Sequence, residues 1–240
     1  MKNVLKFLFI VSMFTIASCS SDDDKDVTEQ QIGETNGYQY VDLGLSVKWA
    51  TCNVGATSPH DTGNLYAWGE VSPKEEYLST NYKYWTSARN ITKYCTDSNF
   101  GTVDGLTRLT SKDDAVRIEM GGDWRMPTME EISELYTLCT FKRDTLNNIP
   151  GILITGPNGN NMFVPGKTYW EQSGMSNPIY NTRDYYGGFW SADLCTRYEQ
   201  NQTCAYEFFF NTNVRGGGVS YENESTTNRY KGLACRGVIE

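Results

Sequence analysis

Aromatic and arginine side chains gather in two long polar stretches near the C-terminus, residues 166–188 and 211–231, and just beside them. Tyrosine and tryptophan rings stack on the C–H faces of sugars, and together with arginine they anchor protein interfaces. Loops of this length commonly carry function. The alternative is that the rings cover the loops as a small core. The candidate ligand-binding residues are Tyr169, Trp170, Tyr180, Arg183, Tyr185, Tyr186, Arg197, Tyr221 and Arg229.

The chain offers little for acid–base, nucleophilic or metal catalysis. Its single histidine, His60, excludes mechanisms and zinc sites that need two or more. Asp113 and Asp114 are neighbours at a predicted helix start, where carboxylates stabilise the helix dipole rather than face each other across a substrate. Calcium needs several converging oxygen atoms, and the loops contain no convincing set. The sequence therefore predicts a non-catalytic protein without a metal or cofactor.

Six of the seven cysteines lie in the folded part and are predicted to be structural. None forms a Cys-x-x-Cys motif, so zinc-ribbon and thioredoxin-type chemistry have no support. A hairpin centred on Glu199–Gln200 places Cys195 opposite Cys204, close enough for a disulfide, and Phe189 opposite Phe210. The remaining cysteines allow three pairings that stay open: Cys52, Cys95, Cys139 and Cys235.

The N-terminus has the features of an export signal. A basic start precedes an apolar run from Phe7 to Ala17, which is shorter than the roughly 20 residues that span a bilayer. The run ends in Ala17-Ser18-Cys19, which resembles a bacterial lipobox. The resemblance implies cleavage before Cys19 and acylation of its sulfur and amino groups. We expect a signal peptide over residues 1–18 and a lipidated acidic tether over 19–36.

The charge of the chain limits its partners. Acidic residues outnumber basic ones, 29 to 21, which gives a net charge of −8 and disfavours nucleic acid and anionic membrane surfaces. The Ser20–Asp24 run resembles the surface-export signal of lipoproteins in the Bacteroides group. This resemblance implies an outer-membrane lipoprotein exposed at the cell surface, with membrane contact through the lipid anchor only.

Residues 37–240 predict one domain of the α+β class. The counts of 22 glycines and 16 tyrosines against 7 prolines favour short strands and many turns. One helix should begin after an N-cap at Ser111 and end at Gly121, and a second should begin at Thr128 with a capping box to Glu131. The predicted strands are 38–52 (two strands broken near Gly44), 152–155, 162–164 and the hairpin 189–210. The tryptophans Trp49, Trp68, Trp124 and Trp190 are expected in the core.

Several segments of the domain stand in an order that resembles a known family. They are Tyr40–Leu45, Lys48–Ala56, Tyr66–Glu70, Gly122–Thr128, Gly156–Asn160 and Phe189–Ser191. The order is similar to that of Bacteroides surface proteins carrying the Fibrobacter succinogenes major paralogous domain, and Trp124-Arg125-Met126-Pro127-Thr128 resembles that domain's Trp-Arg-Leu-Pro-Thr helix start. The closing segment, Ala234–Val238, departs from the family's Val-Arg-Pro-Val.

The resemblance covers about residues 38–240 and implies a C-type lectin-like fold. Such a fold has two helices packed on small antiparallel sheets, an outer sheet that joins both chain ends, and a long-loop half that carries the ligand surface. Arg125, beside the buried Trp124, is expected to pair with an acid or with carbonyls at the domain centre. The function expected is binding of a glycan or protein ligand.

Two other functions are compatible with the sequence. One is a structural or assembly subunit of a surface complex. The other is an enzyme related to the formylglycine-generating enzymes, which share the fold superclass. Their oxidation needs a close active-site cysteine pair near the C-terminus. Cys195 and Cys204 are separated by a hairpin turn, and Cys235 lies far beyond them, so this alternative is disfavoured.

The lipid anchor gives the first testable prediction. Labelled palmitate should enter the wild-type protein in bacterial cells but not the Cys19→Ala variant, because acylation requires the Cys19 sulfur and the amino group exposed by cleavage. Immunoprecipitation followed by fluorography measures the label. Equal labelling of both proteins would contradict the anchor.

Overall fold

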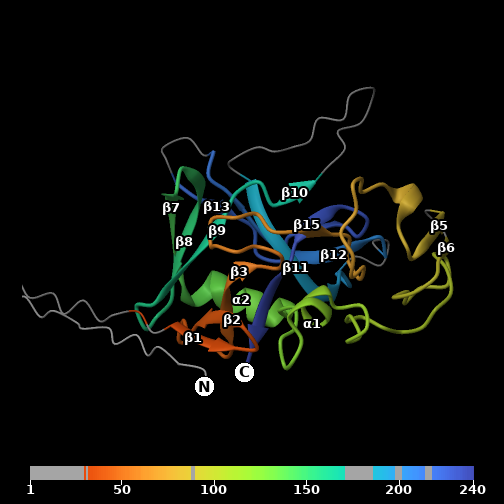
Figure 1. Cartoon of the computed structure of the whole chain (residues 1–240). Coiled ribbons are helices and arrows are strands. Elements are labelled where there is room, and N and C mark those ends of the chain that lie inside the picture. The colour runs from red at the N-terminus through yellow and green to blue at the C-terminus, as the bar shows by residue number, and fades with distance from the viewer. Residues whose placement is uncertain (1–29, 31, 88–89, 171–185, 198–201, 214–217) are drawn as a thin grey trace, which may run out of the picture.

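The computed structural model describes residues 30, 32–87, 90–170, 186–197, 202–213 and 218–240. It is mostly β, with two short helices and several small antiparallel or mixed sheets, which is compatible with the α+β class (Figure 1). The predicted signal peptide, Cys19 and the candidates Tyr180, Arg183 and Tyr185 lie outside the described residues. Within those residues, no helix has the length and apolar character needed to cross a membrane.

The first sheet joins the two ends of the described chain. It is antiparallel and has the order β1 (Ile32–Thr35), β2 (Tyr38–Val41), β3 (Lys48–Asn53) and β16 (Arg236–Ile239). Figure 1 shows the red N-terminal strands close to the C-terminus of the chain. The predicted break near Gly44 is confirmed. Strand β1 falls inside the stretch 19–36 that was predicted as tether, so the sheet begins before residue 37.

The second sheet lies at the centre of the molecule. Its main path is β10 (Tyr169–Trp170), β15 (Gly232–Ala234), β11 (Tyr186–Leu194), β12 (Cys204–Asn211) and β13 (Ser220–Tyr221). Two further strands join it: β14 (Thr226–Asn228) pairs with β12, and β4 (Leu65–Tyr66) pairs with β15. The β11–β15 pair is parallel and the other pairs are antiparallel.

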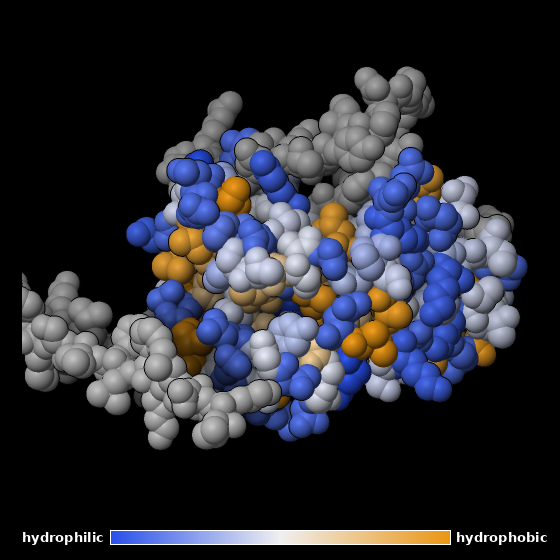
Figure 2. Space-filling view, in the orientation of Figure 1, coloured by the Kyte–Doolittle hydropathy of each residue, from blue (hydrophilic) through white to orange (hydrophobic). Residues whose placement is uncertain are grey.

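Two smaller sheets complete the β structure. One is the antiparallel meander β7 (Thr140–Leu146), β8 (Ile149–Thr155) and β9 (Asn161–Pro165), which confirms the predicted turn at residues 156–160. The other is the pair β5 (Trp85–Ser87) and β6 (Asn90–Ile91), preceded by a 3-10 turn at Ser79–Asn81. On the face drawn in Figure 2, hydrophilic side chains predominate and apolar ones form separate patches.

The two helices begin at caps, one of which differs from the prediction. Helix α1 (Ala115–Met120) is capped by Asp114, whose carboxylate accepts a hydrogen bond from the Arg117 amide at 3.0 Å. The predicted cap, Ser111, is wrong: residues 111–113 form a separate turn, in which the Asp113 amide donates to the Thr110 carbonyl at 2.9 Å, and the helix begins only after Asp114. The predicted stop is confirmed, since Gly121 has a φ of 66°.

Helix α2 (Met129–Leu138) begins with the predicted capping box. The Thr128 hydroxyl accepts from the Glu131 amide at 3.2 Å, and the Glu131 carboxylate accepts from the Thr128 amide at 2.8 Å. Two otherwise unpaired amides are satisfied in this way.

The hairpin formed by β11 and β12 is present, but its register changes along its length. Near the turn the Cys195 amide donates to the Cys204 carbonyl at 3.2 Å, so these residues are opposed as predicted. Further along, Phe189 pairs with Phe208, and the predicted partner Phe210 is wrong. The cause is a β-bulge between Trp190 and Leu194, which leaves more residues on β11 than on β12.

The cysteines of the described residues form no disulfide in this structure. Cys195 and Cys204 are both buried beside each other at the end of the hairpin. A bridge between them therefore stays a prediction, supported by their opposition in the hairpin.

The four tryptophans predicted for the core are all fully buried: Trp49, Trp68, Trp124 and Trp190. The Trp124 ring lies between α1 and the first sheet, where it makes edge contacts with Tyr38 and Tyr40 at 6.4 Å. Its indole N–H donates to the Thr35 carbonyl at 3.2 Å. The side chain thus connects the helical side of the core to β1.

A buried carboxylate, Asp113, organises the region in front of α1. It accepts hydrogen bonds from the hydroxyls of Tyr84 at 2.6 Å and Tyr94 at 2.7 Å, and it forms ion pairs with Lys83 and Lys93. Burial acts to raise the pKa of Asp113, but the hydrogen bonds from Lys93 and the two tyrosines outweigh it and hold the pKa well below its usual range.

The Asp113→Asn variant should make the unfolding free energy less dependent on pH. The folded pKa of Asp113 lies below its unfolded value of about 4, so the ionised form stabilises the fold above that value and the contribution is lost as the pH falls. Wild type should lose more stability than the variant between about pH 6 and about pH 2, measured by urea unfolding. The matched control is Asp123→Asn, at an exposed carboxylate. If the unfolding free energy of Asp113→Asn depended on pH as strongly as that of the wild type, the lowered pKa of Asp113 in the folded state would be contradicted.

Candidate functional site

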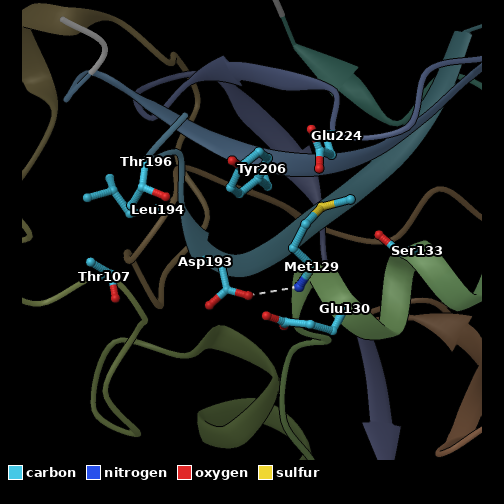
Figure 3. Close-up of a pocket in the computed structure, with 9 residues that line it drawn as sticks. All are labelled: Thr107, Met129, Glu130, Ser133, Asp193, Leu194, Thr196, Tyr206 and Glu224. Atoms are coloured by element: carbon cyan, nitrogen blue, oxygen red, sulfur yellow. Dashed lines mark hydrogen bonds between the residues drawn. The ribbon is translucent and has the colours of Figure 1, made fainter. Parts of the chain in front are cut away.

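A polar cavity of about 330 Å³ opens where the N-terminus of α2 meets the bulged part of β11 (Figure 3). It is lined by Thr107, Met129, Glu130, Ser133, Asp193, Leu194, Thr196, Tyr206 and Glu224. These residues bring four hydroxyl groups, three carboxylates and one aromatic ring. In Figure 3, Tyr206 and Glu224 lie on one side of the opening, and Asp193 and Glu130 lie on the other.

Asp193 lies in the bulged part of β11, and its carboxylate lines the cavity. One carboxylate oxygen accepts from the Met129 amide at 2.8 Å, drawn as a dashed line in Figure 3, and from Arg108 Nη2 at 3.1 Å. The other oxygen accepts from Arg108 Nε. The negative charge therefore faces the positive end of the α2 dipole and a guanidinium fork, both of which favour it.

Two arginines fix the directions of the three carboxylates. Arg108 bridges Asp193 and Glu130, reaching Glu130 at 3.1 Å. Arg197 pairs with Glu224 through Nη1 at 2.6 Å. Because an ionised carboxylate has about four acceptor positions, each of these groups keeps the capacity to accept further hydrogen bonds from a ligand.

The Tyr206 hydroxyl lies beside the Cys195 thiol and Thr196. Burial, followed by the proximity of Cys195 and Glu224, raises the pKa of Tyr206. The phenol is therefore neutral at physiological pH and is able to donate a hydrogen bond. Among the described residues that line the cavity, Tyr206 is the only aromatic one.

A second groove of about 480 Å³ adjoins the cavity and shares Glu130 with it. It contains Arg125, which donates to both oxygens of Glu131 at 2.8 and 2.6 Å. Burial acts to raise the pKa of Glu131, but the hydrogen bonds from Arg125 and from the Thr128 amide lower it overall. The prediction that Arg125 pairs with an acid is confirmed, and the pair stabilises the start of α2.

Arg229 was predicted to bind ligand, but the structure places it in the core. Its side chain is fully buried, with the guanidinium 5.0 Å from the centroid of Trp68. The nitrogens donate to the carbonyls of Tyr94 at 3.1 Å, Gln202 at 3.0 Å and Lys93 at 2.8 Å. These hydrogen bonds join three backbone segments around the guanidinium, so Arg229 supports the core.

Two other predicted residues lie near the cavity. Arg197 holds Glu224, as described above. Tyr221 is 45% exposed and stacks on Tyr136 of α2 with a centroid distance of 5.3 Å. Of the described residues predicted to bind ligand, these two contact a cavity residue or helix α2.

The remaining described candidates lie elsewhere. Tyr186 begins β11 and stacks on Phe209 at 5.8 Å. Tyr169 and Trp170 form β10, paired with β15 at the other side of the sheet.

None of the nine cavity-lining residues was among the predicted binding residues. A weak signal was available: a capped helix N-terminus at Met129–Glu130 is a place where an acidic partner is favoured. Nothing local identifies Asp193 as that partner, because it reaches Met129 only through the bulge. Thr107 and Arg108 lie in a segment without periodicity.

No family model, curated protein or solved structure matches the chain. Across the described residues there is no group of three or more His, Cys, Asp or Glu side chains placed to hold a metal ion. What the cavity presents is a set of oriented carboxylates and hydroxyls around one ring. This arrangement suits a ligand that itself carries several hydroxyl groups.

Asp193→Ala should lower the unfolding free energy by about 2–4 kcal/mol, because the Met129 amide and the Arg108 guanidinium would lose their buried acceptor. The matched control is Glu130→Ala, which also removes a partner of Arg108 but at a side chain that is 78% exposed. The control should cost at most about 1 kcal/mol. Urea unfolding measures both, and an equal or reversed order would contradict the role of Asp193.

Proposed function

We propose that the protein is a cell-surface lipoprotein whose folded domain binds a glycan or protein ligand without transforming it. The observation that carries the proposal is the cavity at the β11 bulge, with its four hydroxyls and three oriented carboxylates. A sugar presents several hydroxyls in a small volume, and each can donate to a carboxylate and accept from a side-chain hydroxyl. The ring of Tyr206 offers a face for sugar C–H groups.

The lining favours a glycan over a protein ligand. Protein interfaces are usually anchored by large apolar side chains that fill apolar pockets. Among the described residues of the lining, Met129 and Leu194 are the only ones with apolar aliphatic side chains. A protein ligand is therefore the alternative, and binding in the cavity itself is best explained by a polyhydroxylated group.

The anchor and the location follow from the N-terminal pattern. Acylation at Cys19 would hold the domain at the outer membrane, and the acidic residues after Cys19 favour exposure at the cell surface. Membrane contact would occur through the lipid chains only, since the acidic chain repels anionic lipid headgroups.

A C-type lectin-like fold of the Fibrobacter succinogenes major paralogous type belongs to the same proposal. Three features support it: two helices on small sheets, a sheet that contains both chain ends, and Trp124 packed beside the Arg125–Glu131 pair at the start of α2. The absence of catalysis is also proposed. Cys195 and Cys204 do not line the cavity, so cysteine oxidation of the formylglycine type has no support there.

An assembly subunit is the second candidate function, and one surface favours it. Ile32 and Leu146 are exposed beside Leu153 and Phe163 in a groove of about 350 Å³ between β1 and the β7–β8 hairpin. Apolar grooves of this kind are used for contacts between proteins.

A glycan and protein array, probed with the detergent-solubilised full-length chain, tests the proposal. We expect selective glycan binding that Glu224→Gln weakens about tenfold, which corresponds to about 1.4 kcal/mol, because one oriented carboxylate is lost. The control is Glu76→Gln, at an exposed acid that does not line the cavity. Silence on the array together with tight co-purification of another surface protein would favour the assembly role instead.

A further inference from the structure

The exposed ring of Tyr221 and the cavity lie along the same helix. Met129, Glu130 and Ser133 of α2 line the cavity, and Tyr136 follows Ser133 by one helical turn. Tyr221 stacks on Tyr136 with an interplanar angle of 20°. From Met129 to Tyr136 the helix rises about 10 Å, so the ring lies beyond the cavity in the direction of the helix C-terminus.

One short turn of the chain connects the ring to the cavity. It begins at Tyr221 in β13 and reaches Glu224, which lines the cavity. Between them, Asn223 Oδ1 accepts a hydrogen bond from the Ser133 hydroxyl at 3.4 Å. The turn therefore runs against α2, and polar groups that can bond to hydroxyls lie between the cavity and the ring.

The Tyr221 ring is held by a column of buried rings. Tyr136 stacks on Phe208 at 5.1 Å, and Phe208 stacks on Phe189 at 4.7 Å. Phe141 supports Tyr221 from a second direction at 4.8 Å. A ring fixed in this way loses little conformational entropy when a ligand stacks on it.

The charge around this surface limits the kind of ligand. The cavity contributes Glu130, Asp193 and Glu224, and the two arginines that pair with them already hold a carboxylate partner. A ligand that carries carboxylate, sulfate or phosphate groups would meet like charges at close range. An uncharged ligand with many hydroxyls can donate to the three carboxylates and accept from the hydroxyls among the described lining residues.

We propose that the ligand is an uncharged oligosaccharide of at least two sugars, one seated in the cavity and a following one stacked on Tyr221. This inference rests on the proposed glycan binding and adds the chain length, the direction along α2 and the lack of charge. Tyr221 acts as the second subsite, and Ser133 with Asn223 lies under the linkage between the two sugars.

Calorimetric titration of the detergent-solubilised full-length chain tests this with three size series, from monomer to tetramer: β-1,4-linked glucose, α-1,6-linked mannose and β-1,4-linked N-acetylglucosamine. We expect at least one tetramer to bind tenfold or more tightly than its monomer. Tyr221→Ala should remove this gain and leave the monomer affinity unchanged, whereas Tyr221→Phe, which keeps the ring, should retain it. Tyr38→Ala, at a tyrosine that is 36% exposed on β2, is the control. Tetragalacturonate should not compete.

The outcomes separate the two proposals. Equal affinity for monomer and tetramer, or a gain that survives Tyr221→Ala, overturns the second subsite; if Glu224→Gln still weakens the bound sugar, glycan binding itself stands. Competition by tetragalacturonate overturns the requirement for an uncharged ligand. Failure of all three series to bind overturns this oligosaccharide proposal, whereas the proposed function still stands if the array finds a ligand whose binding Glu224→Gln weakens.

Discussion

The hydrogen bond from the Met129 amide to the Asp193 carboxylate is the contact on which the site depends. It joins the first turn of α2 to the bulge of β11, and the Arg108 guanidinium donates to both oxygens of the same carboxylate. A helix N-terminus has amides without intrahelical partners and a positive dipole end. The buried Asp193 carboxylate accepts a hydrogen bond from one of these amides, and the dipole stabilises its negative charge. One carboxylate thus sets the helix direction, attaches the segment around Arg108 and forms one wall of the cavity.

The bulge is stable because its backbone groups find partners outside the β12 ladder. The Ser191 carbonyl accepts from the Trp68 indole at 2.9 Å, and the Ala192 carbonyl accepts from the Leu109 amide at 2.9 Å. The Ala192 amide donates to the Pro127 carbonyl at 2.8 Å. An interrupted ladder would otherwise leave buried polar groups unpaired, which is costly. Segments from distant parts of the chain therefore maintain the irregularity that shapes the site.

Two arginines are buried in the core, whereas two of the carboxylates that line the cavity are exposed. Arg236 is fully buried and donates to Asn53 Oδ1 at 2.9 Å and to the Phe163 carbonyl at 3.0 Å, and burial lowers its pKa to about 10. Arg229 likewise bonds to backbone carbonyls. Neutral oxygens thus hold these core cations, whereas the exposed carboxylates of Glu130 and Glu224 pair with the exposed arginines Arg108 and Arg197.

The sequence by itself determined the features that depend on neighbouring residues. The capping box of Thr128 and Glu131, the helix stop at Gly121 and the turn at residues 156–160 each arise from backbone preferences and hydrogen bonds within a few positions, so local pattern was sufficient. The same holds for the opposition of Cys195 and Cys204, which lies next to the hairpin turn.

Tertiary structure decided the rest of the fold and most of the site. Strand β11 is buried on both faces along most of its length, so its sequence has no alternation from which a change of register can be read. The bulge forms because the segment Thr107–Leu109 pairs with the β11 edge, and that partner is remote in the chain. Arg229, in a loop that looked exposed, is buried by the same kind of long-range contact. Of the predicted binding residues, Arg197 and Tyr221 reach the α2 side because β12, β13 and α2 pack together, which no local pattern encodes.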